Sequence, residues 1–308
     1  MLGDSFSIDD GAALVKPVGS KPELRRQQMP VPAPGHVLLR VSSVGLCRTD
    51  LLVADEKISV SKDVILGHEF SGVLAESNGP CSLPIGTRVS TDPTFVRTLD
   101  GTDGYMGLDI DGALATWAVV PATKIFDADG LSDEEAAYLE PIAAAMGGLE
   151  PAQRAGGRGL ILGDNRIATL TSDIFRTSGI RFECLSQEAF RQQTVEGGRC
   201  VYDWILETKL EEDVLALAAE ALKVSGRVIL KSRHAKVSSF PAARWAEKQL
   251  SIVGRSRGDF PTAMTWLREN RGLVAPLLGE SFPLARWNEA FEAAWSGDQG
   301  KIFILLSE

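Results

Sequence analysis

Strands and helices alternate regularly along residues 159–230, and this alternation is the feature that most limits the possible fold. Gly159-Leu160-Ile161-Leu162-Gly163 is a short apolar run between glycines, as expected for a buried strand. Because strands that alternate with helices form a parallel sheet covered on both faces, the sequence predicts a doubly wound α/β domain. Its expected helices are 166–178 and 211–223, and its further strands are 181–185, 200–206 and 227–230.

The residues before this region have the pattern of a β-rich unit. The helical pattern that follows begins at Ser132, which is spaced from Glu135 as in a capping box. Pro141 lies in the same helical stretch and is compatible with two abutting helices, because proline is tolerated in a first turn. Apolar or alternating runs between proline- and glycine-rich turns predict strands at 11–15, 37–44, 69–76 and 113–120. Later elements are helices at 261–269 and 287–295 and a strand at 301–306.

The charge of the chain limits its partners. The 308 residues carry a formal net charge of −9, which argues against nucleic acid because phosphate backbones bind basic surfaces. No apolar run approaches the ~20 residues that cross a bilayer, and the first residues lack the pattern of a secretory signal. The four cysteines are scattered without disulfide spacing, as is typical of a reduced, cytoplasmic protein. We therefore expect a small-molecule substrate and neither a nucleic-acid nor a membrane partner.

Three dispersed side chains have the chemistry of a catalytic zinc site. Cys47 lies in Cys-Arg-Thr-Asp, His68 in Gly-His-Glu and Glu140 in Leu-Glu-Pro. Zinc takes thiolate, imidazole and carboxylate ligands, and a catalytic zinc keeps one position open for water or substrate. Cys47 and His68 are 21 residues apart (68 − 47) and so belong to different elements. Taken singly, each is better explained as a small buried cysteine or a hydrogen-bonded core histidine, and only their combination with Glu140 favours a metal site.

These segments, in this order, resemble the medium-chain dehydrogenase/reductase superfamily, in particular its zinc-dependent alcohol and polyol dehydrogenases of the sorbitol and threonine dehydrogenase type. The resemblance extends over essentially the whole chain. It implies a GroES-like, β-rich catalytic domain formed by 1–140 and 259–308, and a Rossmann-type nucleotide-binding domain formed by 141–258. The segments that carry it most strongly are 45–50, 67–72, 86–89, 111–117, 136–141 and 301–303.

The resemblance also implies roles at the metal. Cys47, His68 and Glu140 would hold Zn²⁺, and Glu69 would be a further carboxylate that can exchange with the metal-bound water. Asp50 would accept a hydrogen bond from the far nitrogen of His68 and so fix the tautomer of the imidazole.

Further positions are expected to contact the substrate and the cofactor. Thr49 would contact the substrate hydroxyl and begin a proton relay. Arg48 and Lys301 match positions whose cations commonly pair with the cofactor pyrophosphate, and the alternative for both is a surface charge without such a role.

The expected dinucleotide loop departs from the family pattern. Gly163 keeps the first glycine, but Asn165 stands where a glycine normally lets the backbone approach the pyrophosphate. Asp164 adds negative charge at the same place, while Arg166 and Ile167 complete the expected cofactor-binding residues of the loop. The departure weakens the prediction of dinucleotide binding.

The acidic residue that usually ends the second strand and binds the ribose is missing. Ser186 stands in its place with Arg191 nearby, which favours NADP over NAD because no carboxylate repels a 2′-phosphate. NAD, or no dinucleotide, are the alternatives. Lys231 stands where relatives have an apolar residue beside the nicotinamide carboxamide. It would contact a phosphate or an acidic substrate, or obstruct the usual cofactor position.

The sequence thus predicts a zinc-dependent oxidoreductase that transfers hydride between a secondary alcohol or ketone of a polar small molecule and NAD(P). A redox-neutral zinc enzyme of the same fold and a non-catalytic binding protein are the alternatives. Residues 90–111 contain no cysteine, so the structural-zinc lobe of many relatives is missing. A homo-oligomer, with a dimer favoured, is nevertheless expected.

Overall fold

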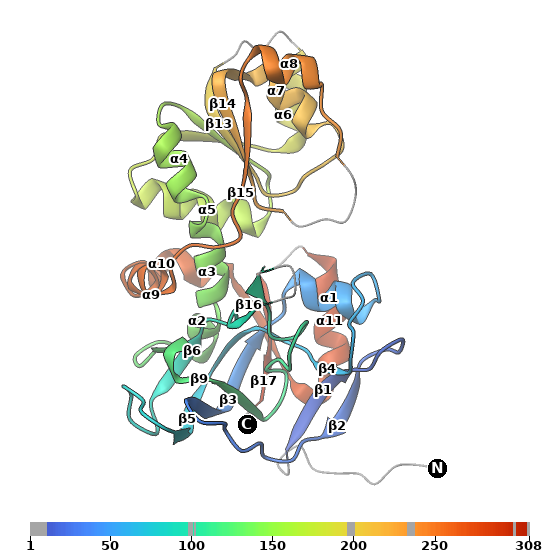
Figure 1. The fold of residues 1–308 in the computed structure, drawn as a ribbon, viewed down its shortest axis with the longest axis vertical. Coiled ribbons are helices and arrows are strands. Elements are labelled where there is room, and N and C mark those ends of the chain that lie inside the picture. The colour runs from blue at the N-terminus through green and yellow to red at the C-terminus, as the bar shows by residue number, and fades with distance from the viewer. Residues whose placement is uncertain are drawn as a thin grey trace. The chain divides into compact units, whose positions relative to one another are not determined.

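The computed structural model describes residues 11–97, 101, 103–195, 201–232, 238–297 and 300–306 (Figure 1). The chain divides into two compact units. Unit 1 consists of Met1–Glu140 and Met264–Glu308, and unit 2 consists of Pro141–Ala263. Unit 2 is therefore an insertion within unit 1. The boundaries expected from the sequence lie after residue 140 and after residue 258, the second of them five residues before Ala263.

Unit 1 is built on a seven-stranded sheet in the order β10-β6-β5-β3-β17-β16, with β9 also paired to β3. The long strand β3 (His36–Gly45) is central, and all of its residues except His36 and Arg40 are buried, so both of its faces are covered. Its neighbours are β5 (Glu69–Asn78), β9 (Trp117–Pro121) and β17 (Lys301–Leu305). The outer strands are β6 (Arg88–Thr91), β10 (Ile125–Asp127) and β16 (Leu278–Pro283).

Smaller elements complete unit 1. A three-stranded sheet has the order β2-β1-β4, and a two-stranded ribbon pairs β7 with β8. The helix at Ser132 has the predicted capping box: Ser132 Oγ accepts the Glu135 N–H, and Glu135 accepts the Ser132 N–H. It ends before Pro141, and a second helix begins at Leu139, which agrees with two abutting helices. The bounds are β1 (Ala12–Lys16), β2 (Glu23–Arg26), β4 (Val64–Ile65), β7 (Val96–Arg97), β8 (Asp103–Gly104), α1 (Arg48–Ala54), α2 (Asp133–Ala137), α10 (Arg271–Val274) and α11 (Trp287–Ser296). Two helices, α3 (Leu139–Met146) and α9 (Phe260–Glu269), contain the residues at which the chain passes from one unit to the other.

One strand of unit 1 begins later than predicted. The sequence predicts a strand over 113–120, but β9 begins at Trp117. The residues before it instead bond to two other segments: Leu114 donates its N–H to Leu66 O at 2.8 Å, and Thr116 donates to Ala12 O at 2.8 Å. The backbone of this segment therefore connects β1 to the turn that carries His68.

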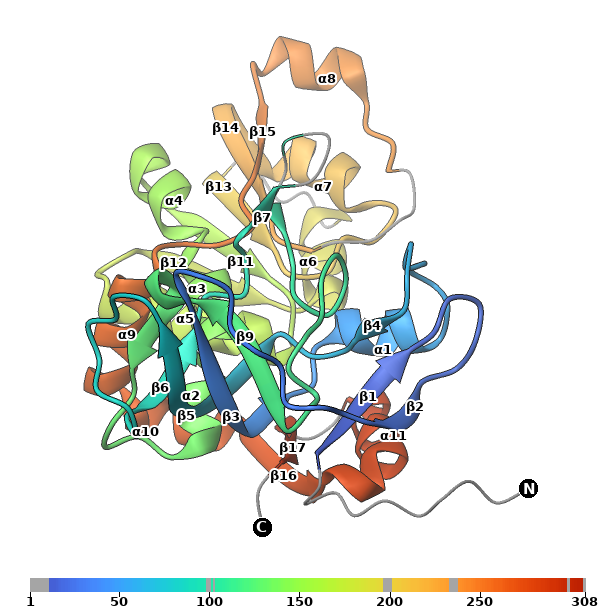
Figure 2. The same ribbon diagram turned by 60° about the horizontal axis from the view of Figure 1, so that its bottom comes forward.

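Unit 2 contains a five-stranded parallel sheet in the order β12-β11-β13-β14-β15 (Figure 2). Leu160, Ile161 and Leu162 of β11 are fully buried, as the apolar run predicts. The α/β prediction is confirmed. The order matches strands 2-1-4-5-6 of a doubly wound fold, and no described strand lies beyond β12 in the place of strand 3. The strands are β11 (Gly159–Leu162), β12 (Phe182–Leu185), β13 (Tyr202–Glu207), β14 (Leu222–Leu230) and β15 (Ser251–Gly254), and the helices are α4 (Leu149–Ala155), α5 (Arg166–Thr177), α6 (Gln187–Val195), α7 (Val214–Ala221) and α8 (Ala242–Glu247).

The helix predicted over 211–223 is shorter in the structure. It is α7, which ends at Ala221 because β14 begins at the next residue. The buried ammonium group of Lys248 donates to Ala219 O and, at 2.7 Å, to Leu222 O. This contact from a distant part of unit 2 satisfies carbonyl groups that a longer helix would have bonded internally. Among the helices of the described ranges, none combines the length and the apolar character of a membrane span.

Candidate functional site

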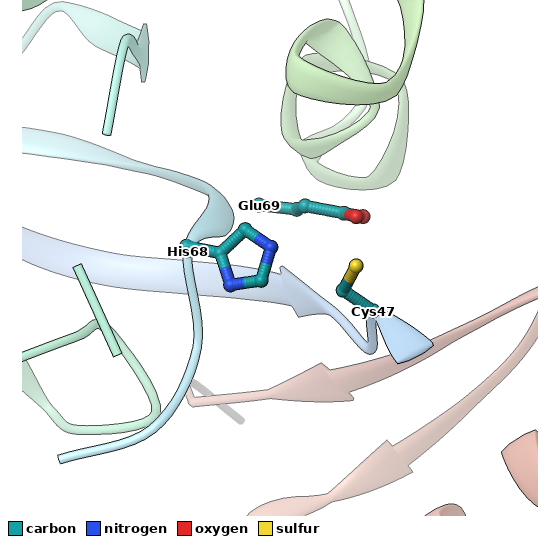
Figure 3. A group of neighbouring side chains, drawn as sticks. All are labelled: Cys47, His68 and Glu69. Carbon is teal, nitrogen blue, oxygen red and sulfur yellow. The ribbon is translucent and has the colours of Figure 1, made fainter. Parts of the chain in front are cut away.

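Three side chains of unit 1 lie close enough together to act as ligands of one metal ion. Cys47 Sγ, an imidazole nitrogen of His68 and a carboxylate oxygen of Glu69 all lie within 4.8 Å of one another. Figure 3 shows the sulfur and the carboxylate close together beside the imidazole ring. His68 and Glu69 are buried and Cys47 is half-buried. Two of the three ligands expected from the sequence, Cys47 and His68, are thus brought together.

The local backbone places these side chains. Cys47 follows the end of β3 and is the N-cap residue of α1. His68 follows Gly67, whose φ of +91° lies in the left-handed region that favours glycine. The backbone of Gly112 packs so closely on this turn that a Cβ there would lie 2.2 Å from Gly67 O. Both glycines are therefore needed for the turn that presents His68.

Asp50 connects the two ligand segments. Its side chain is 1% exposed. Its Oδ2 accepts the N–H of Cys47 at 2.9 Å, and its Oδ1 accepts the N–H of Gly67 at 3.1 Å. The same Oδ1 lies 3.4 Å from His68 Nδ1. A carboxylate in this position orients the ring and leaves Nε2 for a metal, as in many metal sites.

The electrostatics of the group agree with this arrangement. Burial alone lowers the pKa of His68, but the Asp50 carboxylate and Cys47 outweigh burial and hold this pKa well above its usual value. Burial likewise raises the pKa of Asp50, and the attraction of His68 reverses the effect, so the pKa of Asp50 is lowered. The site therefore favours an ionised Asp50 and a positive charge beside it, whether that charge is a proton on the imidazole or a metal ion.

Glu69 forms a buried ion pair with Lys301. Both side chains are 3% exposed, and Lys301 Nζ contacts Glu69 Oε2. Gly45, on the neighbouring strand β3, leaves the space for this pair, because a Cβ at this position would lie 2.7 Å from Lys301 Cε. The resemblance predicts that Lys301 pairs with the cofactor pyrophosphate. In the structure, its ammonium group contacts Glu69.

The other residues expected near the metal lie around this group. Glu140 is 9% exposed and is the second residue of α3, but it does not belong to the group of three. Thr49 lies two residues after Cys47, with its Oγ1 3.8 Å from Cys47 Sγ. Arg48 is exposed, and its guanidinium lies 5.7 Å from the ring centre of Trp295. Tyr105, which the sequence does not single out, packs edge-on against His68 at 6.0 Å between ring centres.

The donor set of sulfur, nitrogen and oxygen fits zinc. Zinc binds thiolate, imidazole and carboxylate ligands, and three protein ligands leave a fourth position for water or substrate. The buried Asp50 supplies the carboxylate–histidine contact that usually orients a metal-ligating histidine. Such a site can polarise an alcohol or carbonyl oxygen.

In unit 2, the loop after β11 has the shape of a phosphate-binding turn. Gly163 has a φ of +141°, and a Cβ there would lie 2.1 Å from Thr208 Oγ1. Asn165 is the N-cap residue of α5: its Oδ1 accepts the Ala168 N–H at 3.0 Å and its Nδ2 donates to Thr208 Oγ1 at 3.0 Å. The side chain of Asn165 is thus hydrogen-bonded both to the first turn of α5 and to Thr208, which follows β13.

The helix start still offers donors to an anion. Arg166 Nε is buried and has no hydrogen-bond partner among the described residues. Arg166 and Ile167 are the first residues of α5, where backbone N–H groups have no acceptor within the helix. Helix N-termini of this kind bind phosphate groups. The residues present therefore fit the pyrophosphate of a dinucleotide, although Asp164 is an exposed negative charge beside it.

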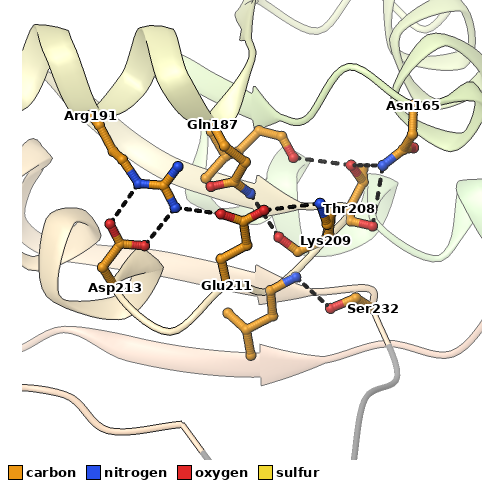
Figure 4. Close-up of polar contacts among 10 residues, drawn as sticks. Asn165, Gln187, Arg191, Thr208, Lys209, Glu211, Asp213 and Ser232 are labelled. Atoms are coloured by element: carbon orange, nitrogen blue, oxygen red, sulfur yellow. Dashed lines mark hydrogen bonds and ion pairs between the residues drawn. The ribbon is translucent and has the colours of Figure 1, made fainter. Parts of the chain in front are cut away.

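The polar residues after β12 are engaged with the loop after β13 (Figure 4). Ser186 Oγ accepts the Ala189 N–H at 3.1 Å and so caps α6. Arg191 donates from Nε to Asp213 Oδ2 at 2.7 Å and from Nη2 to Asp213 Oδ1 at 2.9 Å, and Nη2 also contacts Glu211. The guanidinium is thus paired with two carboxylates.

Lys231 is also engaged within unit 2. Its Nζ donates to Arg255 O at 2.9 Å, to Ser256 O at 3.0 Å and to Ala144 O. Its backbone N–H donates to Glu207 Oε1 at 2.8 Å. Lys231 thus bonds three carbonyl groups, and its ammonium group is not free for a phosphate or an acidic substrate.

Sequence reasoning missed the residues that hold this end of the sheet together. Glu207, Glu211 and Asp213 were not among the expected site residues. Glu207 had a recognisable signal, since it is a charged residue at the end of the apolar run Trp-Ile-Leu. Glu211 and Asp213 had none, because their partner Arg191 is 20 and 22 residues away in the sequence.

Comparisons with known proteins agree with this architecture. Residues 33–130 match the alcohol dehydrogenase GroES-like domain family. The chain is 24% identical to a sorbitol dehydrogenase of Halalkalibacterium halodurans over 95% of this chain and 98% of that protein. It is 27% identical to an L-threonine 3-dehydrogenase of Ruegeria pomeroyi over 92% of this chain and 97% of that protein.

A solved structure shows the same fold. The short chain alcohol dehydrogenase of Escherichia coli CFT073, complexed with NADH, has a TM-score of 0.82 at 19% identity, with 96% of this chain and 99% of that chain covered. The GroES-like match, the dehydrogenase relatives of full length and the common fold agree with one another. The chain thus carries an alcohol dehydrogenase GroES-like domain, and over nearly its whole length it is similar in sequence to sorbitol and threonine dehydrogenases and in fold to an alcohol dehydrogenase.

Proposed function

We propose that the protein is a zinc-dependent alcohol or polyol dehydrogenase that transfers hydride between a secondary alcohol or ketone of a polar small molecule and a nicotinamide dinucleotide. The observation that carries the proposal is the convergence of Cys47, His68 and Glu69 in a buried group oriented by Asp50. The sorbitol and threonine dehydrogenase relatives support a polar substrate with a secondary hydroxyl group.

Several residues of unit 1 would have separate roles near the substrate oxygen. When bound, zinc would act as a Lewis acid that acidifies the alcohol, and the nicotinamide would accept the hydride. Asp50 holds the imidazole of His68 in one orientation. Thr49, half-buried beside Cys47, has a hydroxyl group that would contact the substrate hydroxyl and begin a proton relay, releasing its own proton outward as it takes up that of the substrate. Lys301 balances the charge of Glu69, so that one buried carboxylate is neutralised even without a metal ion.

The identity of the third protein ligand is open to experiment. Glu69 lies within ligand distance of the other two residues, and Glu140 is the carboxylate that the family resemblance implies. We propose Cys47, His68 and one of these two glutamates as the ligands. Metal content per chain of Glu69→Gln and Glu140→Gln, measured by mass spectrometry of the purified proteins, would identify which carboxylate binds.

The test of the proposed function combines metal content with turnover. We expect about one zinc per chain, its loss in Cys47→Ala, and retention in the matched control Cys184→Ala, since Cys184 is exposed and outside the group. We also expect zinc-dependent reduction of NAD⁺ or NADP⁺ with a panel of polyols and amino alcohols. Bound zinc without any dinucleotide-linked turnover would refute the oxidoreductase and favour a redox-neutral zinc enzyme. The homodimer expected from the sequence stays a prediction, which sedimentation of the purified protein would test.

A further inference from the structure

Arg191 is held by two carboxylates from a neighbouring loop. Asp213 binds its guanidinium at two positions, 2.7 and 2.9 Å, and Glu211 contacts the same Nη2. These hydrogen bonds raise the pKa of Arg191, and they lower the pKa of both Asp213 and Glu211. The bidentate geometry is the one in which arginine otherwise binds phosphate. The carboxylates therefore occupy Nε and Nη2, two of the donors with which the guanidinium would bind a phosphate group.

The loop that carries these carboxylates is acidic. Residues 209–213 read Lys-Leu-Glu-Glu-Asp, so three negative charges accompany one positive charge. Gln187 joins the loop to the start of α6, because its Nε2 donates to Lys209 O at 2.7 Å (Figure 4). The contact crosses from the end of β12 to the end of β13, which flank β11 in the sheet. The acidic loop therefore lies beside the residues that follow β12, the place where dinucleotide-binding folds bind the ribose.

In dinucleotide-binding folds of this kind, the residue that follows the second strand decides between the two cofactors. A carboxylate there binds the ribose hydroxyl of NAD, and an arginine nearby accommodates the 2′-phosphate of NADP. This chain lacks the carboxylate after β12 and has the arginine. The sequence therefore favours NADP, but that preference requires an arginine whose charge is not already neutralised.

We propose that Glu211 and Asp213, by pairing with Arg191, make the dinucleotide site of unit 2 select NAD(H) over NADP(H). The acidic loop after β13 takes the place of the missing carboxylate after β12. A 2′-phosphate would have to displace the two carboxylates from Arg191 and would then lie beside their negative charges. This inference rests on the proposed function only in assuming that unit 2 binds a dinucleotide.

Binding measurements on the full-length protein test the inference without turnover. NADH and NADPH are titrated by their fluorescence against the wild type and against the double variant Glu211→Gln/Asp213→Asn. We expect the wild type to bind NADH at least about tenfold more tightly than NADPH, as like charges at close range produce. In the double variant, NADPH binding should tighten about tenfold or more, while NADH binding changes less than about threefold. The preference of the wild type should also weaken at high salt.

Matched controls separate the proposed contact from net charge and from unfolding. Glu212→Gln removes one charge from the same loop at an exposed side chain that does not bind Arg191, so NADPH affinity should change little. Adding Arg191→Gln to the double variant should abolish the gain in NADPH affinity. Because the three paired side chains are between 29% and 44% exposed, the variants should fold, which thermal unfolding checks.

Each outcome decides the question. Equal or tighter binding of NADPH by the wild type overturns the inference, as does an equal gain in Glu212→Gln. If the wild type binds neither cofactor, the dinucleotide part of the proposed function fails. The inference is overturned with it, because it requires NADH binding, whereas NADPH binding as tight as NADH binding overturns the inference and leaves the dinucleotide part of the proposed function standing. Loss of zinc or of turnover would leave these binding results unaffected.

Discussion

Glu207 is fully buried at the end of β13, and replacing it with alanine should strongly destabilise unit 2. Its Oε1 accepts the N–H groups of Lys231 and Ser232 at 2.8 and 2.9 Å, and its Oε2 accepts the Ser232 hydroxyl at 2.7 Å. Ser232 Oγ in turn accepts the Leu210 N–H at 3.0 Å. One carboxylate thus fixes the exit of β14 and, through Ser232, the exit of β13.

The magnitude follows from these bonds. A hydrogen bond to a charged group contributes roughly 1.5–3 kcal/mol, and an unsatisfied buried donor costs a similar amount. Lys231 and Ser232 are only partly buried, so water would replace part of what is lost. We therefore expect Glu207→Ala to lower the free energy of unfolding of unit 2 by about 3 kcal/mol. Glu207→Gln keeps one acceptor oxygen and should cost about 1–2 kcal/mol.

Native-state hydrogen exchange is the suitable assay, because the two units need not unfold together. The N–H groups of Lys231 and Ser232 should exchange about 100-fold faster in Glu207→Ala, since 1.4 kcal/mol corresponds to tenfold. Glu212→Ala serves as the control, because this glutamate is exposed and should leave exchange unchanged. If Glu207→Ala lowers the free energy of unfolding of unit 2 by less than about 1 kcal/mol, the reasoning is refuted, because water would then replace all three hydrogen bonds.

Three further changes should have smaller or conditional effects. Gly159→Ala would place a Cβ 1.9 Å from the Trp204 ring and should lower stability by about 1–3 kcal/mol in urea unfolding, so an unchanged midpoint would contradict this packing. Asn165→Ala removes the N-cap of α5 and should cost about 1 kcal/mol, whereas Asn165→Asp, which keeps the acceptor, should cost less. For Glu135, burial raises the pKa, but the bond from Arg271 outweighs it and lowers the pKa below 4.5. The stability lost in Glu135→Gln should therefore be largest near neutral pH and should shrink as the pH falls below 4.5, which denaturation at several pH values measures.

The sequence predicts those parts of the fold that depend on local pattern. The apolar run of β11 and the capping box at Ser132 both appear in the structure as expected, because they depend on residues close together in the chain. The helix expected over 211–223 ends early, since the carbonyl groups at its end are bonded by Lys248, which is 26 residues from Leu222. No local pattern carries that information.

In the candidate sites too, features that depend on nearby residues are predictable from the sequence, and contacts between distant segments are not. Cys47 and His68 are recognisable from the segments around them, and the structure brings them together. Which carboxylate approaches them depends on how β5 and α3 are placed, and sequence spacing does not determine that placement. The expectation that Arg191 binds NADP stays a prediction, and the sequence leaves out part of its setting: the charge of Arg191 is visible there, but its partners Glu211 and Asp213 come from another loop.

Because unit 2 is an insertion within unit 1, unit 1 can complete its fold only after unit 2 has been translated. Domains generally fold from the N-terminus onward as the ribosome releases the chain. Here Lys301 is made 38 residues after Ala263 (301 − 263), the last residue of unit 2. The strand that carries Lys301 pairs with β3, whose residues are among the first to emerge. The Ser43–Gly45 end of β3 therefore lacks its β17 partner until the whole of unit 2 has been translated, and the buried contact of Lys301 with Glu69 forms only after that.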